Sequence, residues 1–341
     1  MRNVYRWMLS KIRGRDTEHY NEMLDIMARE TGKNRTAVKA DMYWNILTRG
    51  VGYNDYFLGD YVNATKEEKD TFITSRKYYR LLQYLNDPAY TCVLNDKLVF
   101  DAFFNRYLGR DFINLRATGP AELAEFLHGK RAVFAKDANG YGGHGVERIV
   151  PAEEPDVEAL YRRLAAHNQY LVEDAIVQCD EVEELNPNAV ASFRVVTLYK
   201  DGEAHLMGNA LRCTRDDADT VGCSNDLYFS LGEDGRVSSN VSDDNATIYT
   251  HHPRTGKAFA DVCIPGVAEA FEMCRAAALM LPQVRYIGWD VAFSDHGPVL
   301  LEGNEWPAFC LVQHVKMTGR RTGHLKDLRE VLGSELDTFK L

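Results

Sequence analysis

The sequence predicts an α+β protein in which two mixed lobes, with a cleft between them, follow a helical N-terminal region. Three observations support this fold class. Residues 1 to about 90 read as helical and are rich in aromatic side chains. From residue 94 onward, short strand-like runs alternate with helical segments. Near the C-terminus, apolar runs at 287–293 and 298–301 flank a short turn, which is typical of a β-hairpin.

The expected elements can be followed along the chain. In the first region, helices are expected to end at three places: Gly50, Gly59 and the Asn-Asp-Pro stretch at 86–88. A helix starts at Pro120, since proline is tolerated at the first helical position. Turn signals and apolar periodicity predict these further elements: helix 96–108, strands 132–136 and 147–150, helix 155–166, strand 170–176, a hairpin of 191–199 and 203–212, strands 229–231 and 237–240, helix 266–280 and helix 326–332.

We expect three segments, namely a helical N-terminal region at 1–93, a first lobe at 94–180 and a second lobe at 181–341. Within the first segment, residues 4–12 place apolar side chains at helical spacing among basic ones. Such a segment fits either a helix packed on the rest of the protein or one that lies on a membrane surface.

The composition is that of an ordinary globular protein and argues against several classes. The 341 residues are 45% hydrophobic and 26% charged, and the net charge of −10 disfavours nucleic-acid binding, which needs a basic face. No apolar run approaches the roughly 20 residues that span a bilayer. The start is a poor signal peptide, because only a very short apolar patch precedes Lys11. Seven dispersed cysteines without a C-x-x-C pair fit reduced thiols, so we expect a cytoplasmic enzyme.

The late hairpin carries polar groups that an apolar strand would not hold without a partner. If its loop has three residues, Asp290 lies opposite Glu302 with Cβ atoms about 5 Å apart, and Asn304 faces the same way. A loop of four residues would place Asp290 beside Leu301 instead. Adjacent carboxylates repel each other unless a cation sits between them, and carboxylate and amide oxygens suit Mg²⁺, which usually also binds substrate phosphates. The pattern predicts a metal site; a solvent-facing hairpin with scattered charges is the alternative.

A glycine-rich loop follows a lysine at the end of a strand. Four of the six residues 140–145 are glycine, which lets consecutive backbone N–H groups converge on phosphate oxygens. Lys136 ends the apolar run before this loop, where a buried lysine needs an anionic partner. Together they predict a phosphate-binding site, and the alternative is a hairpin turn beside an ordinary edge lysine.

Two arginines stand among the apolar residues of the hairpin at 191–212. Strand alternation puts Arg194 on one face with Val196 and Leu198, and Arg212 ends the facing strand. An arginine in such surroundings needs a fixed anion, and its planar fork suits phosphate or carboxylate. Both arginines are therefore candidates for catalysis, with a structural salt bridge as the alternative.

The spacing Asp290 followed by Glu302-x-Asn304 resembles the metal end of an ATP-grasp enzyme. Upstream, 132–146 resembles the strand lysine and glycine loop of that superfamily, and 170–176 resembles its adenine hinge. Finer features resemble the sugar-transfer-associated ATP-grasp subfamily; they are Val177-Gln178, Leu185-Asn-Pro, Ser192-Phe-Arg-Val-Val-Thr197, Ala210-Leu-Arg212, Ile287-Gly-Trp-Asp290 and Gly297-Pro298. The resemblance runs from roughly residue 94 to residue 311.

This resemblance implies the ATP-grasp fold, ATP and Mg²⁺ as cofactors, and roles for particular residues. The metal ligands would be Asp290, Glu302 and Asn304. The residues in contact with phosphate would be Lys97, Lys136, Gly142, Gly143, His144 and Gly145. The adenosine would be held by Glu173 at the adenine amine, by Ile176 as an apolar wall, and by Gln178 or Asp180 at the ribose. The γ-phosphate and the carboxylate being activated would be held by Arg194 and Arg212.

The activity implied is that of an ATP-dependent carboxylate–amine ligase, which forms an amide through an acyl phosphate. The substrates would be carboxylates and amines of small molecules, sugars or peptides, and the subfamily name points to surface-glycan assembly. A kinase for hydroxyl acceptors and a non-catalytic nucleotide-binding protein of a glycan complex are the alternatives. Weak association with a membrane surface or a glycan-assembly complex, and formation of a homodimer, are compatible with the sequence.

Overall fold

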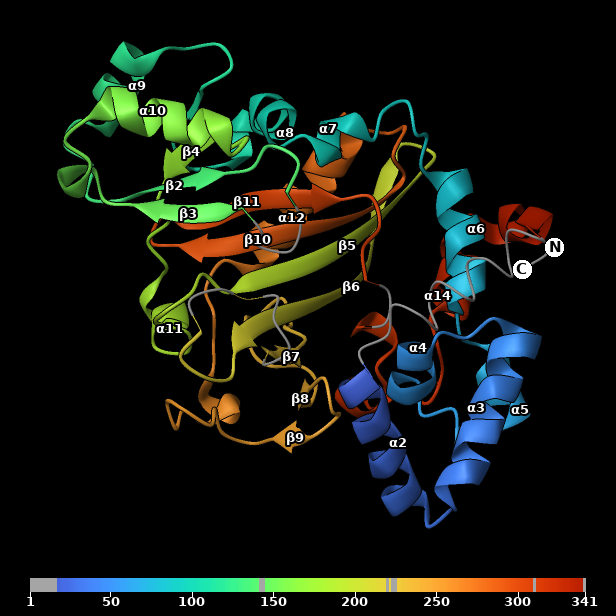
Figure 1. Cartoon of the computed structure of the whole chain (residues 1–341). Helices are drawn as coiled ribbons and strands as arrows, with labels where there is room; N and C mark the ends of the chain where they lie inside the picture. Colours follow the sequence, from blue (N-terminus) through green and yellow to red (C-terminus); the bar gives the residue numbers. More distant parts are fainter. Residues whose placement is uncertain (1–16, 141–144, 219–220, 222–225, 309–310, 340–341) are drawn as a thin grey trace. The chain divides into compact units, whose positions relative to one another are not determined.

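A computed structural model of the chain describes residues 17–140, 145–218, 221, 226–308 and 311–339 (Figure 1). The described chain forms two compact units. The first combines residues up to 84 with 242–248 and with those from 308 onward, and the second combines 85–241 with 249–307. Helices and antiparallel sheets are both present, so the α+β prediction is confirmed. The predicted amphipathic stretch at 4–12 lies outside the described residues.

The first unit is helical and includes the C-terminal residues. Its elements are α2 (Thr17–Thr31), α3 (Arg35–Arg49), α4 (Tyr53–Leu58), α5 (Lys66–Asp70), α6 (Ser75–Leu85), η4 (Leu311–Gln313), α13 (Val315–Thr318), α14 (Leu325–Leu332) and η5 (Gly333–Phe339). Helix α3 begins where Asn34 Oδ1 accepts from the backbone N of Thr36 at 2.8 Å and ends at Gly50, whose φ of 72° places it in the left-handed region. Stacked Tyr56 and Tyr61 lie in the core of this unit.

Long-range contacts explain why the C-terminal residues belong to the helical unit. The side-chain oxygen of Gln313 accepts from the backbone N of Ile73 at 2.9 Å, and Arg321 forms an ion pair with Glu68 at 2.9 Å. Residues far apart in sequence therefore share one unit. The segments 1–93, 94–180 and 181–341 remain a proposal about domain organisation.

The second unit contains a four-stranded antiparallel sheet in the order β1-β4-β2-β3. Its strands are β1 (Phe112–Asn114), β2 (Val133–Lys136), β3 (Val146–Ile149) and β4 (Leu171–Asp174). Helices α9 (Pro120–Leu127) and α10 (Val157–Ala166) cover one face, where their leucines share a core with Val133 and Val172 (Figure 1). Three short helices come before β1: α7 (Cys92–Asn95), α8 (Lys97–Phe103) and η1 (Asn105–Tyr107). Another, η2 (Pro151–Glu153), follows β3. The predicted helix 96–108 thus ends early, at Phe103.

A larger sheet has the strand order β11-β10-β5-β6-β7-β8-β9. Its strands are β5 (Ser192–Lys200), β6 (Glu203–Thr214), β7 (Asp226–Phe229), β8 (Val241–Asp243), β9 (Ile248–Tyr249), β10 (Tyr286–Ser294) and β11 (Gly297–Asn304). Other elements of this part are α11 (Asp180–Glu183), η3 (Phe259–Asp261) and α12 (Val267–Met280). The strands predicted at 229–231 and 237–240 are wrong, since Leu231 and Val237 form only an isolated bridge around the Asp234-Gly235 turn.

The core of this part is large and apolar. Helix α12 contributes Phe271 and Cys274 to it, and the sheet contributes Phe193 and the fully buried Trp289. The indole nitrogen of Trp289 donates to Thr197 Oγ1 at 2.9 Å, which satisfies its one polar group. This core packs against β5, β10 and β11, the three strands that carry Arg194, Asp290 and Glu302.

The hairpin of β10 and β11 has a shorter turn than either predicted loop. Ser294 pairs with Gly297, so only two residues form the turn, and Val291 pairs with Leu300. The register then shifts by one between Val291 and Asp290, which leaves Leu301 as the extra residue of a β-bulge. Asp290 consequently lies opposite Glu302, as predicted, although the predicted loop of three residues is wrong. The extra residue that the prediction placed in the loop is instead Leu301, in the bulge, and it produces the same pairing of Asp290 with Glu302.

Candidate active site

The candidate site is built on a row of charged residues that crosses three neighbouring strands. Arg194 on β5 lies opposite Asp290 on β10, and Asp290 lies opposite Glu302 on β11. The Arg194 guanidinium donates from Nε to Asp290 Oδ1 at 2.5 Å and from Nη2 to Asp290 Oδ2 at 2.9 Å. The Asn304 side-chain nitrogen lies 3.2 Å from Asp290 Oδ2 and 3.3 Å from Glu302 Oε1. The fold therefore brings the three predicted metal ligands and one predicted catalytic arginine together.

Charges along this row shift the ionisation of its two carboxyl groups in opposite directions. Burial alone would raise the pKa of Asp290, but the charge and hydrogen bonds of Arg194, together with Glu302 and Arg212, hold that pKa below its ordinary value. Burial and the neighbouring charge of Asp290 raise the pKa of Glu302, against the opposing effect of Lys97, whose Nζ lies 3.8 Å from Glu302 Oε2. The negative charge of Glu302 is therefore balanced by less positive charge than that of Asp290. An added cation would stabilise the Glu302 carboxylate more than the Asp290 carboxylate.

The donor set of this row fits Mg²⁺. Two carboxylates and an amide supply the hard oxygen ligands that the ion prefers, and each oxygen of Asp290 keeps an acceptor site beyond its bond to Arg194. The amide of Asn304 directs its nitrogen at both carboxylates, so it has to turn its oxygen inward before it can act as a ligand. Among the described residues, no three His, Cys, Asp or Glu side chains gather for a metal. Substrate phosphates would complete the coordination, as is usual for Mg²⁺.

The two predicted phosphate-binding lysines lie on neighbouring elements of the second unit. Lys97 is the first residue of α8 and reaches Glu302, as described above. Lys136 ends β2 and forms an ion pair with Glu173 on β4. Arg110 donates from Nε to the same carboxylate at 2.9 Å and from Nη1 to the carbonyl of Leu300 on β11 at 2.7 Å. Arg110 therefore ties the four-stranded sheet to the strand that carries Glu302.

Glu173 is buried between these two cations. Burial alone would raise its pKa, but Lys136 and Arg110 hold the pKa below its ordinary value. The anionic partner that the sequence required for Lys136 is thus supplied by the protein itself. Binding of the adenine amine by Glu173 remains a prediction, and the amine would have to compete with two buried cations for the same carboxylate.

The glycine loop is described only at its ends. Gly145 has a φ of 75°, and a Cβ atom there would lie 2.8 Å from Asp137 Cβ, so any other residue would be strained. Its carbonyl accepts from the backbone N of Asp137 at 2.9 Å, which closes the loop at its base. The predicted phosphate contacts of Gly142, Gly143 and His144 lie outside the described residues.

The hinge after β4 places its three candidate residues differently. Ile176 is half-buried, and Asp180 is exposed as the first residue of α11. Gln178 is buried, its Oε1 accepts from the backbone N of Ala191 at 2.7 Å, and its Nε2 donates to the carbonyls of Asn186 and Ala189, both at 3.0 Å. The amide of Gln178 is thus occupied by the backbone, which favours Asp180 for the predicted ribose contact.

Arg212 lies two residues beyond the row on β6. Its Nε is 3.2 Å from Asp226 Oδ2, and its guanidinium lies over the ring of Tyr228, 5.2 Å from the centroid. Burial would lower the pKa of Arg212, but Tyr228 and Asp226 outweigh burial and raise that pKa. Arg212 also acts electrostatically on Asp290, so it belongs to the same charged group as Arg194.

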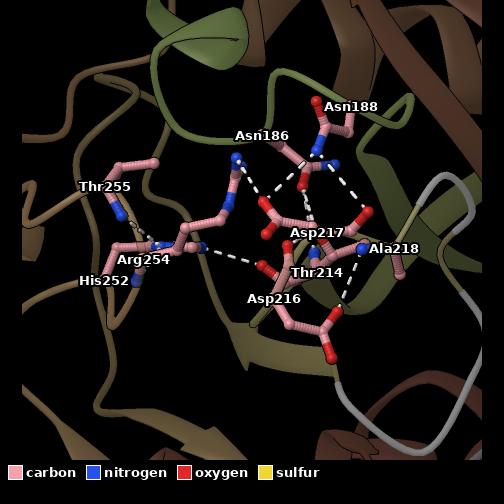
Figure 2. A network of polar contacts seen from close by, with 9 residues as sticks. All are labelled: Asn186, Asn188, Thr214, Asp216, Asp217, Ala218, His252, Arg254 and Thr255. Carbon is pink, nitrogen blue, oxygen red and sulfur yellow. Dashed lines mark hydrogen bonds and ion pairs between the residues drawn. The ribbon is translucent and has the colours of Figure 1, made fainter.

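The end of β6 beyond Arg212 is held by a polar network (Figure 2). Asn186 Oδ1 accepts from Thr214 Oγ1 at 2.6 Å, and the ring nitrogen Nε2 of His252 donates to the carbonyl of Thr214 at 2.8 Å. Since a carbonyl only accepts, His252 carries its proton on Nε2. Through the bond from Gln178 to the carbonyl of Asn186, the network connects the hinge to the strand that carries Arg212.

Sequence reasoning missed three charged residues that the fold adds to the site. Arg110 and Asp226 hold Glu173 and Arg212, respectively, and no sequence signal joins either pair. Asp101 is buried on α8, near both predicted phosphate-binding lysines. Its position four residues after Lys97, on the same side of a helix, was the one signal that could have revealed it.

Two sheets that bear a strand lysine, a glycine loop and a hairpin with paired carboxylates define an ATP-grasp protein. The sequence pattern of the family described as sugar-transfer associated ATP-grasp matches residues 154–327, just over half of the chain, and the chain belongs to this family. ATP-grasp enzymes use ATP with Mg²⁺. The predicted family, fold and cofactors are therefore confirmed.

Known structures that the comparison finds similar share little sequence with this chain. The ATP-grasp ligase PsnB, solved with a minimal precursor, is 13% identical with a TM-score of 0.44, over 75% of this chain and 64% of that chain. D-alanyl-alanine synthetase A from Vibrio cholerae O1 biovar eltor is 10% identical with a TM-score of 0.45, over 74% and 68%. D-cycloserine synthetase DcsG is 14% identical with a TM-score of 0.43, over 71% of each chain. This chain thus spans 64% of the length of PsnB.

No curated protein sequence matches the chain. Among the described helices, none combines the length and the apolar character needed to cross a bilayer.

Proposed function

We propose that the protein is an ATP- and Mg²⁺-dependent carboxylate–amine ligase that forms an amide bond through an acyl phosphate. The observation that carries this proposal is the row Arg194–Asp290–Glu302 with Asn304 beside it. One short row presents two carboxylates for a metal and, beside them, an arginine guanidinium that pairs with Asp290 and would share its charge with a bound anion. Ligase chemistry needs both groups close to each other, because the γ-phosphate and the substrate carboxylate meet at one point.

In the first step, an oxygen of the substrate carboxylate attacks the γ-phosphorus of ATP, and ADP leaves. In the second step, the amine nitrogen attacks the acyl carbon, the amide forms, and phosphate leaves with the former carboxylate oxygen. Arg194 and Arg212 would hold the γ-phosphate and the carboxylate, while Lys97 and Lys136 would hold the phosphates of ATP. Mg²⁺ bound by Asp290, Glu302 and Asn304 would offset the charge of the phosphates. The protein contributes positioning and charge neutralisation.

The substrates are proposed by class. The family description supports a carboxylate or amine on a sugar, in the context of surface-glycan assembly. The ligase PsnB, solved with the precursor peptide PsnA2 and AMPPNP, supports a peptide substrate instead. Both classes provide a carboxylate and an amine, so the same chemistry serves either.

An isotope experiment tests the reaction. Carboxylates labelled with ¹⁸O are screened with amines and Mg²⁺–ATP, and ADP release identifies active pairs. One ¹⁸O atom per product phosphate is expected, because the acyl phosphate passes a carboxylate oxygen to phosphorus. Hydroxylamine in place of the amine should give a hydroxamate. ADP release with a stable phosphoester and no labelled phosphate would replace the ligase with a kinase.

A further inference from the structure

A buried carboxyl group near the proposed phosphate site has no role in the reaction described above. Asp101 stands on α8, one helical turn after Lys97, and is 1% exposed. Its Oδ2 has no hydrogen-bond partner in the described part of the chain. Burying a carboxylate oxygen without a partner is costly, so such a group in a folded protein needs an explanation.

Charged groups from four segments act electrostatically on this carboxyl group: Glu173 on β4, Arg110 before β1, Lys136 on β2 and Lys97 on its own helix. Glu173 already engages Arg110 and Lys136, so Asp101 shares cations that have another partner. Burial, followed by the charge of Glu173, raises the pKa of Asp101 to about 7.

Nucleotide phosphates would change these surroundings in one direction. They carry several negative charges, and they would draw Lys97 and Lys136 toward themselves. Asp101 would then lose part of the attraction that favours its anion and would gain repulsion from the phosphates. Both effects favour the neutral carboxylic acid.

We propose that Asp101 is a positioning residue whose carboxyl group competes with nucleotide phosphates for Lys97 and Lys136, so that nucleotide binding is coupled to uptake of one proton by Asp101. The inference rests on the proposed function, because it takes the phosphates to bind at these two lysines. Linkage then requires nucleotide affinity to fall as the pH rises above about 7, where Asp101 must gain a proton before the phosphates bind.

Calorimetry of Mg²⁺–ADP binding tests this coupling. The full chain is titrated at pH 8 in Hepes and in Tris, whose ionisation enthalpies differ, so the heat difference counts the protons taken up. Wild type should take up close to one proton more than Asp101→Asn, while protons from the nucleotide itself are common to both proteins. Asp101→Asn should bind about tenfold more tightly than wild type at pH 8 and equally at pH 6. Glu125→Gln removes an exposed charge on α9 and should change neither quantity.

Equal proton uptake by wild type and Asp101→Asn would overturn the coupling. If Asp101→Asn does not fold, the wild-type protein alone tests the proposal. Proton uptake on ADP binding that is present at pH 8 and largely absent at pH 6 supports the proposal. Equal proton uptake at both pH values overturns it. No ADP binding by wild type would defeat the proposed function, and this inference with it. Normal ADP binding without the extra proton defeats this inference alone.

Discussion

Arg194 and Asp290 face each other across β5 and β10, and two hydrogen bonds, from Nε to Oδ1 and from Nη2 to Oδ2, join them. One carboxylate is therefore shared between a candidate catalytic arginine and a candidate metal site. The salt bridge considered as an alternative role for Arg194 is present, and it lies inside the candidate site rather than apart from it. Substitution of either residue will affect both stability and chemistry, so informative experiments have to separate the two effects.

Arg194→Lys should lower kcat about a hundredfold while the affinity for ATP changes little. Lysine keeps the charge but cannot donate two parallel bonds to one anion. An interaction that strengthens as charge moves onto the transferring phosphoryl group lowers the barrier without tightening ground-state binding. Steady-state kinetics together with ATP titration measure both quantities, and Arg148→Lys on the exposed part of β3 is the control. A variant that melts much earlier but whose folded fraction keeps full activity would make Arg194 purely structural.

Glu302→Gln should abolish turnover and remove most of the Mg²⁺ dependence of nucleotide binding. Glutamine keeps the shape of the side chain but loses the carboxylate charge that attracts the ion. Because the Glu302 side chain is 39% exposed, the melting temperature of the Glu302→Gln variant should stay close to that of wild type. Nucleotide titrations with and without EDTA provide the measurement. Turnover at the wild-type rate would remove the metal assignment.

Asp290→Asn should also abolish turnover, but with a loss of stability that Glu302→Gln lacks. Removing Asp290 leaves the Arg194 guanidinium, 18% exposed, without its bidentate partner. Breaking a buried pair in this way costs roughly 3–5 kcal/mol. Urea unfolding of the two variants side by side measures the difference, and equal stability would show that Arg194 finds another partner.

Lys136→Ala should weaken ATP binding by roughly 1.5–3 kcal/mol, because it removes a charged contact to phosphate. Lys130→Ala is a matched control, since Lys130 also forms an ion pair with a residue of β4, Asp174, in the same sheet. Calorimetric titration with an ATP analogue compares the two variants. Unchanged affinity in Lys136→Ala would leave Lys136 as a partner of Glu173 only.

Asp101→Asn should flatten the pH dependence of stability in the absence of nucleotide. The pKa of Asp101 rises from 3.8 to about 7 on folding, chiefly through burial. The folded protein then binds more protons than the unfolded chain between these values, so its free energy of unfolding falls as the pH rises through that window. The full effect is on the order of 4 kcal/mol. Urea unfolding at pH 5 and pH 8 should show wild type losing stability and Asp101→Asn losing much less; parallel losses would contradict the burial of an ionisable group there.

Several features of the fold were predictable because they depend on neighbouring residues. Gly50 ends α3 in the left-handed region that glycine adopts easily, and Asp201-Gly202 form the turn between β5 and β6, with φ values of 50° and 93°. The polar residues that interrupt the apolar strands β10 and β11 marked the candidate site. Local conformational preference and strand alternation are properties of the sequence itself.

The register and the partners were decided by tertiary structure. Either predicted loop length was reasonable from the sequence, yet the hairpin combines a two-residue turn with a bulge at Leu301, because the packed core on one face decides which side chains point inward. In the same way, the anion beside Lys136 is Glu173, and the sequence could not show that Arg110 shares this carboxylate.

By itself, the sequence determined which residue types were available for chemistry and on which strands they lie. Only the tertiary structure decided which charges compensate one another. Burial removes water from Asp101, Glu173 and Asp290, so each of these carboxyls depends on the cations that folding brings beside it. Lys136 and Arg194 lie far from Glu173 and Asp290 in the sequence, and they come close only because β2 pairs with β4 and β5 pairs with β10.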